Sequence, residues 1–203
     1  MKLTLTQQIT LDGVIQAPGG PEEDPSDGFP HGGWSFPFFD EELGAYNAEL
    51  LGRADAYLLG RRTYDIFAAY WPLRTDPADT IAGPLNSRPK YVASRTLKSA
   101  DWAGTQIIGG SDLVKDVTAL KERPGGELQI HGSAALAAFL LGHGLIDTVR
   151  LLTCPVVLGT GKRLFTDRVL PATFRLAESR AFAKGVVFST YELAGRPTYG
   201  TFE

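Results

Sequence analysis

Apolar and polar residues alternate at the start of the chain and recur at other spacings further on. Residues 2–9 alternate with a period of two, which predicts a strand with one buried face. From Gly13 to Gly33 the pattern breaks into glycine, proline and acidic residues, and this predicts a long loop. Because long loops without structure of their own are uncommon in compact domains and are typically lids or binding loops, we expect a functional site near it.

Strand and helix periodicities alternate through the rest of the chain. Apolar stretches predict strands at residues 56–59, 90–94, 105–108, 127–131 and 148–153. Apolar faces at helical spacing predict helices at residues 41–52, 63–70, 77–86, 111–122 and 133–141. Two strands with no helix between them, 174–182 and 186–193, predict a closing antiparallel pair that turns at Gly185. This order predicts one domain, residues 1–203, of three-layer α/β class with a mostly parallel central sheet and an antiparallel C-terminal strand pair.

Composition and charge exclude several classes of function. The net charge of −3 and the pI of about 5.7 provide no basic surface for nucleic acid. The single cysteine, Cys154, excludes an internal disulfide, and the three histidines form no cluster at metal-ligand spacing. The chain shows no signal-peptide pattern at its start and no apolar run of membrane-spanning length. We therefore expect a cytoplasmic, metal-free protein that contacts neither membranes nor nucleic acid.

Three strand ends are followed by small or hydroxyl residues and then by a helix. At such places free backbone N–H groups and the helix dipole favour anions. The three segments are Gly60-Arg61-Arg62-Thr63, Gly109-Gly110-Ser111 and Gly132-Ser133-Ala134. In the first, the guanidinium groups match phosphate oxygens and Thr63 is expected to cap the helix; the alternative is that both arginines are solvated. Ser133 is expected to cap the helix after the third segment, as in any ordinary N-cap, while Asp112 would repel phosphate from the second.

A further polar pair, Ser94-Arg95, directly follows an apolar strand. The carboxyl ends of strands are where open α/β sheets bind ligands, although a polar turn would have the same sequence. The chain contains no Gly-x-Ser-x-Gly elbow, no Walker-type loop and no Gly-x-Gly-x-x-Gly motif. Hydrolase and kinase functions therefore lose support.

Candidates for proton chemistry and for substrate contact lie in or beside the long loop. Asp40 is either the N-cap of the helix at 41–52 or a catalytic acid, and both roles stay open. Asp12 belongs to a Leu-Asp-Gly turn, where shaping the backbone is the expected role and catalysis is the alternative. Trp34, Phe38 and Phe39 either form an aromatic wall for a planar substrate or anchor the loop to the core; the preceding long loop favours the wall.

Five segments, taken in order, resemble the dihydrofolate reductase-like family, in the branch that contains the reductase domain of riboflavin biosynthesis. The segments are Thr10-Leu11-Asp12-Gly13-Val14-Ile15, Leu59-Gly60-Arg61-Arg62-Thr63-Tyr64, Tyr91-Val92-Ala93-Ser94-Arg95, Ile130-His131-Gly132-Ser133-Ala134 and Pro155-Val156-Val157-Leu158-Gly159-Thr160-Gly161-Lys162-Arg163-Leu164-Phe165. They span nearly the whole chain, so the resemblance implies the fold and the cofactor of that family.

The implied cofactor is NADPH, bound at the ends of the strands. The resemblance places Gly60, Arg61, Arg62 and Thr63 at its phosphates, Ser94 and Arg95 beside the adenosine 2′-phosphate, Gly132, Ser133 and Ala134 against the pyrophosphate, and Gln8 and Ile15 near the nicotinamide. Gly159 and Gly161 would let their loop approach the cofactor. Next to them, Lys162 and Arg163 are either surface charges or a phosphate grip.

The resemblance implies hydride transfer from NADPH to a pterin, a pyrimidinone or another heteroaromatic small-molecule substrate. NADPH is expected in preference to NADH, because a 2′-phosphate needs cations that NADH would not use. Classical members of the family carry an acid after Trp-x-x-Pro-x; here Phe39 stands in that place and Asp40 follows it. Two alternatives stay open: a riboflavin-pathway pyrimidinone reductase, and a catalytically inactive NADPH- or nucleotide-binding dimeric module. A homodimer is implied, with the strand pair at 174–193 as a candidate interface.

Overall fold

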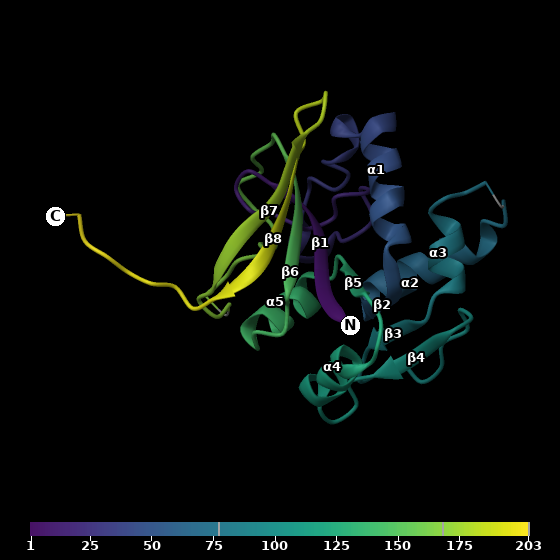
Figure 1. Cartoon of the computed structure of the whole chain (residues 1–203). Helices are drawn as coiled ribbons and strands as arrows, with labels where there is room; N and C mark the ends of the chain where they lie inside the picture. The colour runs from purple at the N-terminus through teal and green to yellow at the C-terminus, as the bar shows by residue number, and fades with distance from the viewer. Residues whose placement is uncertain (77, 168, 203) are drawn as a thin grey trace.

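The computed structural model describes residues 1–76, 78–167 and 169–202, which form a sheet with helices on both faces (Figure 1). The strands are β1 (Lys2–Thr10), β2 (Ala54–Gly60), β3 (Lys90–Ala93), β4 (Thr105–Ile108), β5 (Glu127–His131), β6 (Thr148–Cys154), β7 (Thr173–Ala181) and β8 (Val187–Gly195). The helices are α1 (Glu41–Gly52), α2 (Arg61–Tyr70), α3 (Ala82–Ser87), α4 (Leu113–Glu122) and α5 (Ala134–Gly142), with the 3-10 turns η1 (Ser26–Gly28), η2 (Phe36–Phe38) and η3 (Trp71–Leu73).

The strand order across the sheet is β4-β3-β2-β5-β1-β6-β8-β7. Strands β1 to β6 pair in parallel, whereas β8 runs antiparallel to both β6 and β7. The prediction of a three-layer, mostly parallel α/β fold with an antiparallel C-terminal pair is confirmed, including the turn at Gly185, whose φ is +85°. Because parallel strands end at the same edge, the segments that follow β1, β2, β3 and β5 meet there.

The two faces of the central strands differ in chemistry. On one face, apolar side chains from β1 and β5 pack against α4 and α5; they include Leu3, Leu5, Leu128 and Ile130. The other face lies beneath α1, and the strand positions that point to it carry polar residues. One of them, Gln129, donates its amide N–H to Leu50 O of α1 at 2.7 Å. Buried polar residues on this second face are unusual, since parallel sheets are typically apolar on both faces.

Three helix starts differ from their prediction by two residues or more. Helix α2 begins at Arg61, and its N-cap is Gly60, so the predicted capping role of Thr63 is wrong. The chain turns helical directly after β2, which leaves Thr63 inside the first turn. Helix α4 begins at Leu113 and not at 111, because the Asp112 side chain accepts from Lys115 N at 3.0 Å and so sets the N-cap. Of the helix predicted at 77–86, the structure shows α3, and Pro77 lies outside the described residues.

Candidate functional site

Two of the predicted cofactor segments meet where the neighbouring strands β2 and β5 end. A Cβ atom built on Gly60 would lie 1.9 Å from Ser133 Oγ, so only glycine fits between the two segments. A Cβ atom on Gly132 would lie 3.7 Å from Thr63 Oγ1. The starts of α2 and α5 therefore lie side by side at the carboxyl edge of the sheet.

The same two helices lack side-chain caps. Asp40 and Asp112 cap α1 and α4, and Asp79 Oδ1 accepts from two amides at the start of α3. By contrast, neither Gly60 nor Ser133 caps its helix through a side chain, so the predicted Ser133 cap is wrong. The backbone of Ser133 is left-handed, with φ of +65°, and its hydroxyl lies against Gly60. The first-turn N–H groups of α2 and α5 are left without such acceptors, which is the arrangement that binds anions.

The predicted 2′-phosphate residues lie one strand further along the same edge. Ser94 follows β3, and its hydroxyl accepts from Thr96 N at 3.3 Å and Leu97 N at 3.1 Å, which shapes the turn. Arg95 is exposed. Arg61 is also partly exposed and pairs with Asp65 one helical turn later, with 2.7 Å between Nε and Oδ2. The turn role of Ser94 is observed, and the phosphate contacts of these residues stay predictions.

Asp12 holds the loop after β6 against the end of β1. Its carboxylate accepts from Thr10 Oγ1 at 2.6 Å and from Gly159 N at 2.9 Å, and it pairs with Arg163 at 3.3 Å. The hydrogen bond from Thr10, together with the backbone amides, lowers the pKa of Asp12 to about 2. The contacts with the backbone of the later loop agree with a backbone-shaping role for Asp12. A catalytic role stays a prediction.

The two glycines of that loop have different surroundings. A Cβ atom on Gly159, whose φ is +75°, would meet nothing within 4 Å. On Gly161 it would lie 2.7 Å from the ring of Phe29 and 2.8 Å from Val14. Gly161 therefore allows the loop to pack on the core, whereas Gly159 borders open space; the approach of both glycines to a cofactor stays a prediction.

Around the start of α1, the structure shows anchoring contacts. Asp40 Oδ1 accepts from Leu43 N at 2.9 Å, which makes Asp40 the N-cap. Trp34 is buried, and its indole nitrogen donates to Gln16 O at 2.7 Å, which ties the long loop to the core. Phe38 is partly buried, whereas Phe39 is exposed. A catalytic role for Asp40 and substrate contacts of the aromatic residues stay predictions.

Of the two residues predicted near the nicotinamide, Gln8 lies in β1 and Ile15 lies in the loop that follows it. Ile15 is buried in the core under α4 and α5. Gln8 lies on the polar face of β1, and its buried Oε1 has no hydrogen-bond partner among the described residues. A polar ligand group at this point would satisfy that atom.

A row of polar side chains, buried except for the half-buried His131, crosses four strands of this face, and it was not predicted. Strand register places His131, Thr6, Arg150 and Thr190 directly next to one another across β5, β1, β6 and β8. Within the described part of the chain, Thr6 Oγ1, Arg150 Nε and Thr190 Oγ1 are buried and lack partners. The alternation of Thr4, Thr6 and Gln8 in a strand that proves central was the available signal.

Hydrogen bonds along β5 fix the state of His131. The Gln129 amide nitrogen donates to Leu50 O and Glu127, so its oxygen accepts from His131 Nε2 at 2.8 Å. The neutral imidazole therefore carries its proton on Nε2, and Nδ1 has a free lone pair. Burial, aided by the positive charge of Arg150, lowers the pKa of His131 to about 4.

The model of the RibD C-terminal domain family matches residues 1–188. The chain belongs to this family. The predicted membership of the riboflavin reductase branch of the dihydrofolate reductase-like family is thereby confirmed.

Known proteins similar to this RibD C-terminal domain support the same fold. The "Uncharacterized protein YyaP" of Bacillus subtilis (strain 168) is 31% identical over 197 residues, with 96% of each chain covered. A pyrimidine reductase-like protein from Corynebacterium diphtheriae superposes with a TM-score of 0.61 at 15% identity, covering 95% of this chain and 91% of that one. Dihydrofolate reductase from Enterococcus faecalis, complexed with NADP(H) and RAB-propyl, gives 0.57 at 15% identity, covering 95% and 96%.

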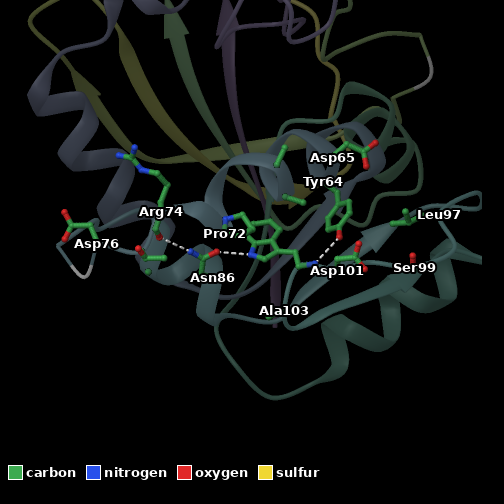
Figure 2. A pocket seen from close by; sticks show the side chains of 15 residues that line it. Tyr64, Asp65, Pro72, Arg74, Asp76, Asn86, Leu97, Ser99, Asp101 and Ala103 are labelled. Atoms are coloured by element: carbon green, nitrogen blue, oxygen red, sulfur yellow. Dashed lines mark hydrogen bonds between the residues drawn. The ribbon is translucent and has the colours of Figure 1, made fainter.

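A pocket of this RibD C-terminal domain lies away from the predicted site residues. The pocket in Figure 2 lies between α2, α3 and the 97–103 segment and contains none of the predicted site residues. Its Asn86 is used structurally, accepting from Trp102 Nε1 at 2.9 Å. Among the described residues no cluster of metal-ligating side chains is found, and none of their helices is long and apolar enough to cross a membrane.

His131 should make the fold sensitive to mild acid. Its folded-state pKa lies below the unfolded value, so the unfolded chain binds more protons between about pH 6.5 and pH 4. We expect the free energy of unfolding to fall by about 3 kcal/mol across this window. Chemical denaturation at pH 7 and pH 4 measures it. His131→Gln, which keeps a donor for Gln129, should remove this loss, whereas exposed His143→Gln should not; equal losses in all three proteins would contradict the assignment.

Proposed function

We propose that this chain is an NADPH-dependent reductase that transfers hydride to a heteroaromatic substrate such as a pterin or a pyrimidinone. One observation carries the proposal: α2 and α5 start uncapped beside each other, and Gly60 leaves only enough room for Ser133 between them. Family membership supports a reductase-type activity. When bound, the cofactor would supply the hydride, and the protein would bind and orient it.

In this proposal the residues of the edge have separate tasks. The first turn of α2, from Arg61 to Thr63, and the segment Gly132 to Ala134 bind the pyrophosphate through backbone N–H groups. Ser94 and Arg95 flank the 2′-phosphate. Gln8 and Ile15 border the nicotinamide, with Gly159 near it.

The acceptor would lie against the polar face beside Gln8. Thr6 is two residues before Gln8 on the same face of β1. Its Oγ1 begins a row of atoms that have no hydrogen-bond partner in the described parts of the chain, and the row continues to Arg150 Nε and Thr190 Oγ1. An N–H donor next to two hydroxyls matches a ring whose edge carries carbonyl and amino groups. This supports a polar heteroaromatic acceptor over a purely apolar one, because buried polar atoms need partners.

Cofactor titration tests the proposal. We expect NADPH to bind at least about tenfold more tightly than NADH, because a charge-assisted contact with the 2′-phosphate contributes on the order of 1.5–3 kcal/mol. Fluorescence titration with both cofactors measures this. Arg95→Gln should bring NADPH affinity close to that of NADH, while Arg53→Gln at the opposite end of β2 should leave it unchanged. Equal affinities in the wild type would refute the preference, and no binding would refute the function.

A second candidate is a module that binds NADPH or another nucleotide without catalysis. The observation that favours it is that both candidate catalytic acids already make structural hydrogen bonds. Asp40 caps α1, and Asp12 holds the loop after β6. Oxidation of NADPH with a panel of pterins, pyrimidinones and quinones separates the two. Turnover of a pyrimidinone alone would identify the riboflavin-type reaction, and tight NADPH binding without turnover would favour the module.

A further inference from the structure

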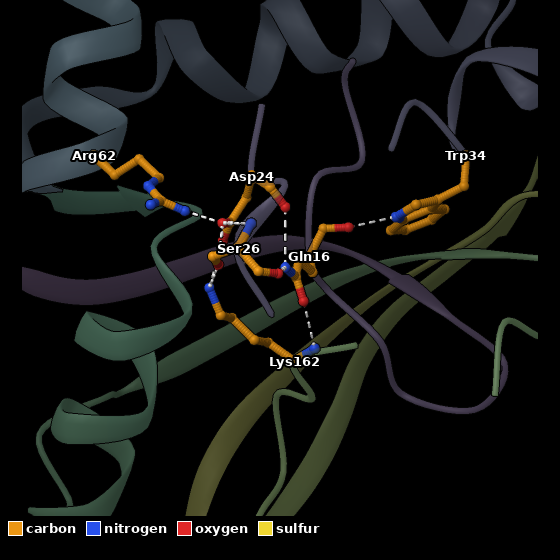
Figure 3. A network of polar contacts seen from close by, with 6 residues as sticks. All are labelled: Gln16, Asp24, Ser26, Trp34, Arg62 and Lys162. Carbon is orange, nitrogen blue, oxygen red and sulfur yellow. Dashed lines mark hydrogen bonds and ion pairs between the residues drawn. The ribbon is translucent and has the colours of Figure 1, made fainter. Parts of the chain in front are cut away.

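The long loop places one carboxylate between two cations from distant parts of the chain (Figure 3). Asp24 Oδ1 contacts the Arg62 guanidinium at the start of α2. Asp24 Oδ2 accepts from Lys162 Nζ at 2.7 Å. The Asp24 side chain is 14% exposed, against 54% for Arg62 and 36% for Lys162. The carboxylate is thus the covered member of the triad, and the cations reach it from the solvent side.

The loop holds this carboxylate in position by further contacts. Ser26 Oγ donates to Asp24 Oδ1 at 2.5 Å, and the Gln16 amide nitrogen donates to the Asp24 and Ser26 carbonyls at 3.0 Å each. Gln16 Oε1 in turn accepts from Lys162 N at 2.9 Å, and Trp34 anchors Gln16 O. The backbone of Lys162 is therefore placed independently of its side chain, whose ammonium group also donates to Ser26 Oγ at 2.6 Å. The contact of this ammonium group with Asp24 can break while the backbone stays in place.

Arg62 belongs to the uncapped first turn of α2, where the proposed function places a cofactor phosphate. A diphosphate arriving there would bring negative charge next to Asp24 in a partly buried place. The negative charges of Asp24 and the phosphate would repel each other. Both cations would pair more strongly with the phosphate than with Asp24, because the phosphate has more oxygens and more negative charge. Binding of Asp24 and a phosphate to the same two cations is therefore unfavourable in free energy.

We propose that the Asp24 carboxylate occupies the position of a phosphate group, and that a diphosphate displaces it from Arg62 and Lys162. The inference rests on the proposed function and assigns to it a phosphate ligand, Lys162, and an internal competitor, Asp24. Before binding, Asp24 keeps the two cations close together and limits their mutual repulsion. Binding then exchanges one set of ion pairs for another, which makes affinity depend on how firmly the loop holds Asp24.

Titration with inorganic pyrophosphate and with NADPH tests the exchange. Asp24→Asn should bind both ligands about five- to tenfold more tightly at low salt, since two partly exposed ion pairs no longer have to break. Affinity should also fall more steeply with salt in Asp24→Asn than in the wild type, because binding then forms new ion pairs without losing old ones. Glu22→Gln is the matched control, since it removes the same charge from an exposed position of the loop.

Lys162→Gln tests the second cation. In the Asp24→Asn background it should weaken pyrophosphate binding about fivefold and return the salt dependence toward the wild-type slope. If Asp24→Asn does not fold, Asp24→Ser removes the charge in its place. Affinities equal to those of Glu22→Gln would overturn the inference, as would no effect of Lys162→Gln. If pyrophosphate follows the expected pattern but NADPH does not bind, the inference stands and the proposed function fails.

Discussion

Gly60→Ala should abolish NADPH binding and lower the free energy of unfolding by about 1–3 kcal/mol, as overpacking of a tight contact does. The new Cβ atom would lie 1.9 Å from Ser133 Oγ and 2.5 Å from Ser133 Cβ. Rotation of the Ser133 side chain moves Oγ away, but the backbone fixes Cβ, so that contact can only be relieved by a backbone shift. The starts of α2 and α5 must then separate, and with them the N–H groups proposed to bind the pyrophosphate. Cofactor titration and chemical denaturation measure the two effects.

A second-site change makes this prediction specific. Ser133→Gly removes both atoms that the new methyl group meets, and its φ of +65° suits glycine. The double variant Gly60→Ala/Ser133→Gly should therefore regain stability and cofactor binding. Gly83→Ala in α3 is the control, because its Cβ would meet nothing within 4 Å. A Gly60→Ala protein that binds NADPH normally would contradict both the packing and its proposed role.

Arg150→Met should destabilise the fold by about 3–5 kcal/mol, the usual cost of removing one partner of a buried ion pair. The Arg150 side chain is 6% exposed, and its two terminal nitrogens donate to the Glu127 carboxylate at 2.6 and 2.8 Å. Burial raises the pKa of Glu127, yet the hydrogen bonds and charge of Arg150 outweigh it and keep that pKa below its usual range. Without Arg150 the carboxylate would be left charged and poorly solvated.

The sign of the pH effect follows from that lowered pKa. The pair stabilises the wild type above the unfolded-state pKa of Glu127, and this contribution is lost as the pH falls through the folded value. Denaturation series from pH 7 to pH 3 should show less of this loss in Arg150→Met. Arg175→Met breaks an exposed pair with Glu192 and should change stability by less than about 1 kcal/mol. A double variant, Glu127→Gln/Arg150→Met, that is as unstable as the single one would contradict the buried-charge explanation.

Periodicity was enough to predict the strands and the α/β class, because each element carries its own pattern. It was not enough to predict pairing. The pair formed by β7 and β8 was visible in the sequence, but the insertion of β8 between β6 and β7 depends on contacts with Leu151 and its neighbours on β6. The predicted start of α4 was wrong because the capping side chain of Asp112 was overlooked. The predicted start of α2 was wrong because this helix begins after Gly60 without a side-chain cap.

The candidate site was predictable where one segment carries its own signal. Gly60 to Thr63 and Gly132 to Ala134 could be found because glycine and hydroxyl residues follow a strand directly. The contact between Asp24 and Arg62 could not be predicted, because the two residues are 38 positions apart and no local sequence pattern indicates it. The polar row through Thr6 likewise depends on strand register, which forms only when distant strands pair.

The central place of β1 has a consequence for how the chain is made. β1 is synthesised before both of its neighbours, β5 and β6, which end at His131 and Cys154, and β6 pairs in turn with β8, which ends at Gly195. The strand that supplies Thr6 and Gln8 therefore has no native partner until β5 has been synthesised. The pairing that completes the sheet is non-local, and such pairing forms slowly and leaves the strand open to aggregation until then.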